Sequence, residues 1–326
     1  MTQSWQIDGP RVLDIGDEHE RVTKLVIGVV GGRVDVVTHD DSPTARVEVA
    51  DIEGLPLEVS WNGGTLKLTH GKHPDKNVME MLKRTIEGIG RNKVRLSVSV
   101  PVDTRATVST VSADAVVSGV RNRVKVNTVS GALTVSDIVG AIDLNTVSGS
   151  VEGEDLHGPL TANTVSGSIT LQGSTFDSVK GNTVSGDITL DLLDGHTVVA
   201  SNSVSGDITV RAPLTGFDVE GNTATGHVVV DGRTLPRAGK TSHGERGGRL
   251  REGDGSLRLK ANAVSGNVVV LRAGSGAGIP QDAAPGAWPG ATPSAPQDAP
   301  APFAPPSQQT PQDAPAPPWG EDEERA

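Results

Sequence analysis

Apolar and polar residues alternate in short stretches through most of this chain. The alternation is clear in SITL at Ser168–Leu171, DITL at Asp187–Leu190 and DITV at Asp207–Val210. A period of two predicts strands that bury one face. A second short strand, such as AIDL at Ala141–Leu144, precedes each turn that ends in Ser-Gly. The pattern predicts an all-β protein.

The turns recur at a nearly fixed interval. The pentapeptide NTVSG occupies Asn127–Gly131 and returns at Asn145–Gly149, Asn163–Gly167 and Asn182–Gly186. Steps of 18 to 20 residues, with two short strands each, are too short for a repeat that contains a helix. They predict a β-solenoid, similar to a parallel β-helix, in which each repeat is one rung. The central residues of the series are Val111, Val129, Val147, Val165, Val184, Val204, Ala224 and Val264; the last step, of 40 residues, is one step plus an insertion.

Stacked rungs explain why the pentapeptide is repeated. Equivalent residues of neighbouring rungs lie about 4.8 Å apart, so that asparagine amides can hydrogen-bond to the copies above and below. Glycine permits the sharp corner. The direction of Thr and Val stays open, because a bend resets the alternation. The predicted structural ladder comprises Asn127, Asn145, Asn163, Asn182, Asn202, Asn222, Asn262, Ser130, Ser148, Ser166, Ser185, Ser205, Ser265, Gly131, Gly149, Gly167, Gly186, Gly206, Gly226 and Gly266.

The repeats divide the chain into three parts. Residues 1–93 are expected to form a less regular β region, with a hairpin at Asn62-Gly63 and one amphipathic helix over about 74–90 that caps the coil. Residues 94–273 are the repeat solenoid, in which 232–256 lacks alternation and is expected to be a loop insertion. Residues 274–326 hold most of the 21 prolines and seven acidic residues, which predicts a disordered Pro/Ala-rich acidic tail.

Composition excludes several classes of protein. The chain has no cysteine, so it has neither disulfides nor thiolate metal sites, and no metal site or cofactor is expected. A net charge of −11 argues against nucleic-acid binding. No transmembrane segment or secretory signal is evident, and a cytoplasmic location is the expectation. Lys83 and Arg84 make too weak a basic face for a membrane-surface helix.

Two stretches contain residue types that are typical of catalytic or phosphate-binding sites. Asp187, Asp207 and His227 each follow a corner and are expected to stack in successive rungs. Two carboxylates about 5 Å apart fit a retaining glycosidase, but the column has no aromatic platform for a sugar, which favours surface turn residues. The loop Arg237–Gly248 contains Gly-Lys-Thr without the other glycine of a phosphate loop. Candidate partner-binding residues are Arg237, Lys240, Arg246, Arg249, Trp288 and Trp319.

The repeated corner-and-strand units, entered through VRLSVSVPVDTRATVSTVSADAVV at Val94–Val117, carry a resemblance. The chain resembles the bacterial putative-adhesin family of β-strand-repeat domains of unknown function over roughly residues 20–272. The resemblance implies a β-solenoid-like fold.

The repeats leave no convincing catalytic set, since the repeated serines lack a His and Asp arrangement. The sequence therefore predicts a non-enzymatic structural or interaction protein, a binding scaffold that binds a protein partner or itself. Two alternatives stay open. One is a carbohydrate-active hydrolase or lyase on a β-helix, and the other is an exported surface adhesin.

Overall fold

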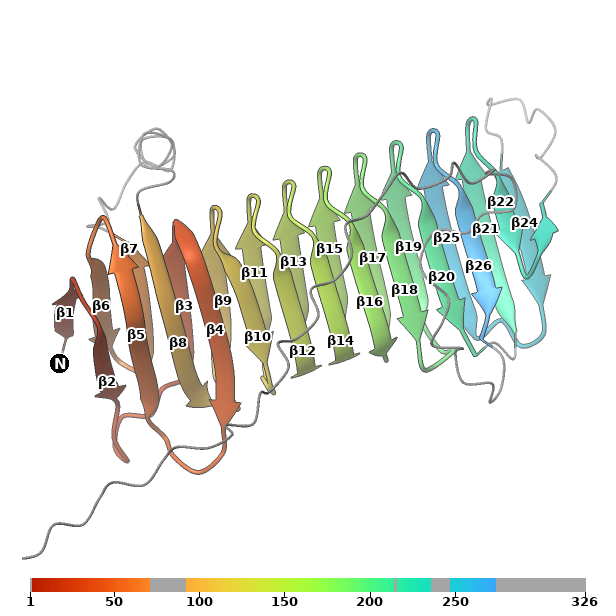
Figure 1. Cartoon of the computed structure of the whole chain (residues 1–326). Helices are drawn as coiled ribbons and strands as arrows, with labels where there is room; N and C mark the ends of the chain where they lie inside the picture. The colour runs from red at the N-terminus through yellow and green to blue at the C-terminus, as the bar shows by residue number, and fades with distance from the viewer. Residues whose placement is uncertain (1, 71–91, 214–215, 236–246, 274–326) are drawn as a thin grey trace, which may run out of the picture. The chain divides into compact units, whose positions relative to one another are not determined.

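Every described strand of the computed structural model lies in one of two long sheets, because alternating residues give each strand one apolar face to bury (Figure 1). The structure describes residues 2–70, 92–213, 216–235 and 247–273. Sheet A holds, in spatial order, β1 (Gln3–Ile7), β6 (Leu57–Asn62), β7 (Thr65–His70), β3 (Lys24–Val29), β9 (Arg105–Thr110), β11 (Val124–Thr128), β13 (Ile142–Thr146), β15 (Leu160–Thr164), β17 (Ser178–Thr183), β19 (Val198–Ser203), β25 (Leu257–Ala263), β21 (Phe217–Thr223) and β24 (Gly247–Glu252).

Sheet B has the matching set of strands. In spatial order it holds β2 (Arg11–Ile15), β5 (Ala45–Glu53), β8 (Lys93–Pro101), β4 (Gly31–His39), β10 (Asp114–Ser118), β12 (Leu133–Val139), β14 (Val151–His157), β16 (Ile169–Ser174), β18 (Ile188–Leu192), β20 (Ile208–Ala212), β26 (Val268–Arg272), β22 (Val228–Val230) and β23 (Arg233–Thr234).

A rung is one strand of sheet A, a corner and one strand of sheet B. From β9/β10 to β19/β20 the rungs stack in sequence order, and every pairing is parallel. Equivalent residues pair across rungs, for example Asn145 with Asn163 and Ile142 with Leu160. The fold is therefore all-β and solenoid-like, as the sequence predicts.

The core lies between the inner faces of the two sheets. Each rung contributes a few fully buried aliphatic side chains, such as Val124, Val126 and Val135. Burial of each such side chain contributes about 1.5–3 kcal/mol relative to its exposure. The large rings Trp61, Phe176 and Phe217 are also buried, so aromatic residues fill part of the interior despite their small number.

Neither end of the stack follows sequence order. At the carboxyl-terminal end, β25/β26 lies between β19/β20 and β21/β22, although it comes last in the chain. At the amino-terminal end, β7 and β8 lie outside β3 and β4. Antiparallel strands then close the described ends: β1 and β6 with β2 and β5 at one, β24 with β23 at the other.

The strand topology tests the predicted hairpin and the predicted loop insertion. The hairpin at Asn62-Gly63 is confirmed, because β6 pairs antiparallel with β7 around it. The interpretation of 232–256 as a loop is wrong in part, because the segment contributes β23 and β24. Those strands show little alternation because they cover an edge and do not build a rung. The predicted helix over about 74–90 and the tail 274–326 lie outside the described residues.

Candidate binding surface at the corners

The corner between the two sheets has the same construction in the four rungs from β13 to β19. In the rung of β13, Thr146 is buried and its Oγ1 accepts a hydrogen bond from Gly149 N at 3.0 Å, while it donates one to Gly149 O at 3.0 Å. The same pair of bonds joins Thr164 to Gly167. The hydroxyl thus satisfies two backbone groups that a tight corner would otherwise leave unpaired. Thr points inward, and the following Val points outward.

The asparagines form a continuous ladder on the outer side of sheet A. Each Nδ2 donates to Oδ1 of the preceding asparagine in the stack, at distances of 2.8 to 3.1 Å. Asn127 ends the ladder with a bond to Ser109 Oγ. All these amides point the same way, so their dipoles add along the stack.

Serine and glycine complete the corner. Ser148 donates both its N–H and its hydroxyl to Val129 O of the previous rung, at 2.8 and 3.0 Å. A Cβ on Gly167 would lie 1.9 Å from Gly149 O, and the other ladder glycines have equally close neighbours. The corners can stack at this spacing only because glycine has no side chain. The predicted ladder residues therefore lie together in one stack.

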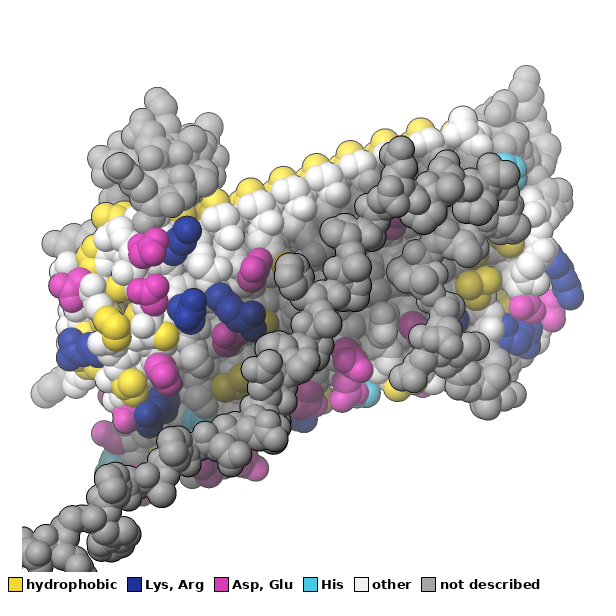
Figure 2. Space-filling model, in the orientation of Figure 1, with side chains coloured by type: hydrophobic (Ala, Val, Ile, Leu, Met, Phe, Trp, Pro, Cys, Tyr) yellow, Lys and Arg dark blue, Asp and Glu magenta, His cyan; other side chains and the backbone are white. Residues whose placement is uncertain are grey.

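The valines of the corners form an exposed apolar row. Six of them are 40 to 55% exposed, although valine is usually a core residue. Figure 2 shows yellow side chains in a straight row along the upper edge of the molecule. The corner band is defined here as the Asn, Val and Ser columns of these six rungs: Asn127, Val129, Ser130, Asn145, Val147, Ser148, Asn163, Val165, Ser166, Asn182, Val184, Ser185, Asn202, Val204, Ser205, Asn262, Val264 and Ser265.

Sequence reasoning missed the exposure of the valines, since a bend hides which side chain faces out. The sequence does not tell the two positions apart. The Val position is replaced by Ala once, at Ala224, and the Thr position is replaced by Ala once, at Ala263.

The predicted column of Asp187, Asp207 and His227 is corrected by the rung order. Asn267 lies between Asp207 and His227, because β26 is inserted between β20 and β22. Asp187 Oδ1 accepts from Asp207 N at 2.9 Å, and Asp207 Oδ1 accepts from Asn267 N at 2.7 Å. Each carboxylate thus binds the backbone of the next rung, which is the role of a turn residue.

The candidate partner-binding residues of the sequence analysis divide into one that the structure describes and five that it does not. Arg249 lies on β24 and makes a bidentate ion pair with Asp218, at 3.0 and 2.8 Å. That hydrogen-bonded guanidinium lowers the pKa of Asp218. Arg249 therefore joins the closing strand β24 to β21. Arg237, Lys240, Arg246, Trp288 and Trp319 lie outside the described residues.

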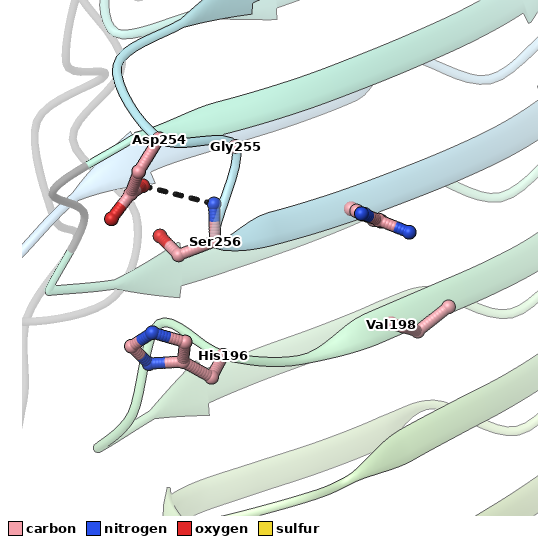
Figure 3. Close-up of a pocket in the computed structure, with 6 residues that line it drawn as sticks. His196, Val198, Asp254, Gly255 and Ser256 are labelled. Atoms are coloured by element: carbon pink, nitrogen blue, oxygen red, sulfur yellow. Dashed lines mark hydrogen bonds between the residues drawn. The ribbon is translucent and has the colours of Figure 1, made fainter.

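A shallow hollow of about 380 Å³ brings together His196, Asp254 and Ser256, beside Val198 and Arg258 (Figure 3). It is not a catalytic triad. His196 Nδ1 lies 3.0 Å from Asp194, not from Asp254, and Asp254 accepts from the backbone N–H of Ser256. The Ser256 hydroxyl donates to Gly216 O at 2.9 Å. A nucleophilic serine needs a base on its hydroxyl, and here that proton is held by a carbonyl.

Among the described residues no group of three or more His, Cys, Asp and Glu side chains is arranged to hold a metal ion. The part of the chain that the structure describes also holds no helix with the length and apolarity needed to span a membrane.

Three solved structures are similar to this chain at low identity. A putative lipid binding protein from Parabacteroides distasonis ATCC 8503 has 14% identity and a TM-score of 0.45, with 82% of this chain and 97% of that chain covered. A putative adhesin from Bacteroides fragilis NCTC 9343 has 12% identity and a TM-score of 0.46, with 83% and 96% covered. A putative cell adhesion protein from Clostridium sporogenes ATCC 15579 has 11% identity and a TM-score of 0.26, with 81% and 100% covered.

No curated protein matches the chain. The family described as Toastrack DUF4097 matches residues 22–271, which covers well over half of the sequence and nearly all of the two sheets. The resemblance to a family of β-strand-repeat domains of unknown function is thereby confirmed. This chain belongs to the Toastrack DUF4097 family.

Proposed function

We propose that this protein is a non-enzymatic interaction scaffold and that the corner band is its contact surface. The observation that carries the proposal is the row of six valines that are 40 to 55% exposed at the same corner of six stacked rungs. Their side chains point away from the core, so they add little to the stability of the fold. Contiguous exposed apolar side chains bordered by polar ones are typical of interaction surfaces.

The polar groups of the band support binding and not catalysis. The Asn amides bond to one another, and the Ser hydroxyls bond to carbonyl oxygens of the preceding rung. The inward Thr hydroxyls bond to the corner glycines. These polar groups make their hydrogen bonds within the stack, and those bonds hold the corner rigid. A rigid row of side chains loses little conformational entropy on binding, which favours association.

Site-specific photo-crosslinking in the native cell tests the proposal. A photoreactive amino acid at Val165 is expected to give discrete crosslinked products. The same amino acid at Thr170, a partly exposed residue on the outer face of β16 in the same rung, is the matched control. Equal product patterns from the two positions, or no products from either, would contradict the proposal.

A cytoplasmic location is part of the proposal, and surface display is the competing case. Protease added to intact cells distinguishes the two. Protection of the chain until the cells are lysed supports a cytoplasmic scaffold. Degradation on intact cells supports the exported adhesin and leaves the corner band as its contact surface.

A further inference from the structure

We infer that the corner band is a self-association surface that binds the corner band of a second copy of this chain. The inference rests on the proposed function and names the partner. Three properties of the band support this choice: its charge, its repeat distance and its size.

The charge of the band suits an identical partner. The chain has a net charge of −11, so two copies carry the same net charge and repel each other at long range. The 18 residues of the band are Asn, Val and Ser only, and they bring no charge into a contact between copies. Carboxylates begin beside the band, at Asp187 and Asp207. An uncharged apolar row is thus the surface where two acidic copies approach at the lowest electrostatic cost.

The repeat distance of the row also suits an identical partner. The valines follow one another at the strand spacing of about 4.8 Å, so the row of six extends about 24 Å. A second copy has the same spacing, so each valine of one row can meet a valine of the other along the whole length of the row. A partner with any other repeat would fall out of step within a few rungs.

The asparagine ladder favours an antiparallel arrangement of the two rows. Its amides point the same way from Asn222 to Asn127, and this gives the band a dipole along its length. Two such dipoles side by side attract when they run in opposite directions. Rotation about a two-fold axis perpendicular to the row produces this arrangement and a closed, isologous dimer. Its centre falls between Val165 and Val184, which then face each other across the axis.

The size of the band sets the strength of the dimer. A row about 24 Å long and three residues wide covers less than the roughly 800 Å² per partner of a standard stable interface. The dimer is therefore weak and reversible. A bilayer is a poorer fit, because the band has no aromatic or basic residue to anchor it at a membrane surface.

Sedimentation velocity on the full chain, from about 10 to about 500 μM, tests the inference. The wild type is expected to shift from monomer to dimer as its concentration rises. Val165→Asp places two like charges beside the two-fold axis, one rung apart and against Val184 of the other copy, and is expected to weaken the dimer by about 10-fold or more. Val139→Asp is the matched control, since Val139 is 42% exposed outside the band and Val165 is 46% exposed. If Val165→Asp does not fold, Val165→Thr is used in its place, because it makes the side chain less apolar and keeps nearly the same shape.

Cysteine crosslinking tests the geometry. The natural chain has no cysteine, so Val165→Cys and Val184→Cys each carry one unique thiol. A mixture of the two proteins, treated with a short bis-maleimide, is expected to give more mixed dimer than either protein gives alone. Preferential crosslinking of each variant to itself would contradict the antiparallel arrangement.

Other outcomes separate this inference from the proposed function. A protein that stays monomeric at all concentrations, while the photoreactive group at Val165 captures a different protein in cells, overturns self-association and leaves the scaffold intact. Flotation with phosphatidylcholine vesicles that is lost in Val165→Asp identifies a lipid surface as the occupant and also overturns it. A monomer that gives no crosslinks anywhere overturns both proposals.

Discussion

The middle of the solenoid and its two ends use similar strands but stack them by different rules. From β9 to β20 every rung pairs in parallel with the next rung of the sequence, and one corner motif repeats. At the ends the chain leaves this order, inserts β25/β26 before β21/β22 and adds antiparallel strands. The last rung of a parallel stack has unpaired backbone N–H and C=O groups along its outer edge. These groups are a template on which a strand of another chain can pair. The comparison indicates that the middle is stabilised by repeated corner bonds and that the ends serve to stop the stack.

The largest effect is expected where the middle depends on glycine. In Gly167→Ala the new Cβ would lie 1.9 Å from Gly149 O, and a backbone atom must move to relieve the contact. We expect a loss of more than about 3 kcal/mol in the free energy of unfolding, because rungs on both sides are disturbed. Urea denaturation, monitored by circular dichroism, measures this free energy. Gly9→Ala is the control from the amino-terminal end, because no atom of the described residues lies within 4 Å of its new Cβ. Equal stability of the two variants would break the comparison.

The second effect concerns the inward hydroxyl. Thr164→Val keeps the shape of the side chain but removes the bonds to Gly167 N and Gly167 O. A buried N–H without a partner costs about 1–3 kcal/mol. Thermal and urea denaturation are expected to show this loss, and Thr189→Val on the outer face of β18 is expected to show little change.

The end of the stack offers the reverse experiment. In β25 the equivalent position is Ala263, so the corner of Gly266 has no hydroxyl from its own rung; Gly266 O accepts instead from Thr223 Oγ1 of the neighbouring rung at 2.9 Å, and the variant would add an acceptor for Gly266 N. Ala263→Thr is expected to stabilise the protein by about 1 kcal/mol, the usual net value of one hydrogen bond. A loss of stability would show that the end rungs do not share the corner geometry of the middle.

A third effect is expected at Ser201, in the last rung before sequence order breaks. Ser201 is 2% exposed on the inner face of β19, and its Oγ has no hydrogen-bond partner among the described residues. Its neighbours at this level are Gly181 and Ala261. Ser201→Ala removes the unpaired hydroxyl and is expected to raise the free energy of unfolding by about 1 kcal/mol. Ser203→Ala is the contrasting variant, because its hydroxyl bonds to Gly206 and its loss is expected to destabilise.

The smallest effect at neutral pH is expected at the amino-terminal end. His70 Nδ1 accepts from Val30 N at 3.2 Å, and burial lowers the pKa of His70 below its ordinary value. As the pH falls, His70 therefore takes up a proton in the unfolded chain before it does so in the folded chain. The stability contributed by neutral His70 is complete above the unfolded pKa of about 6.5, and it is lost as pH falls through the lower folded pKa.

Melting temperatures measured between about pH 5 and pH 8 check this prediction. His70→Asn keeps an acceptor for Val30 N–H but does not titrate, and its stability is expected to fall less towards acid than that of the wild type. His196→Asn, at an exposed position beside Asp194, controls for the loss of a histidine. Identical pH profiles for wild type and His70→Asn would contradict the role assigned to His70.

The sequence by itself determined the features that depend on local periodicity and turn chemistry. Alternation located the strands, the 18–20-residue step predicted stacked rungs, and Asn62-Gly63 predicted the hairpin that β6 and β7 form. The asparagine ladder could be expected because identical residues at identical positions of stacked rungs must meet. The family also followed from these repeats.

Only the tertiary structure decided which rungs are neighbours and which way the corner residues point. The strands β21 and β25 have similar alternating patterns, and either could pair with β19, so the sequence is degenerate at that step. The same ambiguity of pairing explains two differences from the sequence prediction. It put His227 directly after Asp207 in the predicted column, and it hid the closing strands β23 and β24. The exposure of the valine row was decided at the corner, where Thr bonds to Gly and turns Val outward. The candidate binding surface depends on that turn, because a bend ends the period of two from which strand faces are predicted.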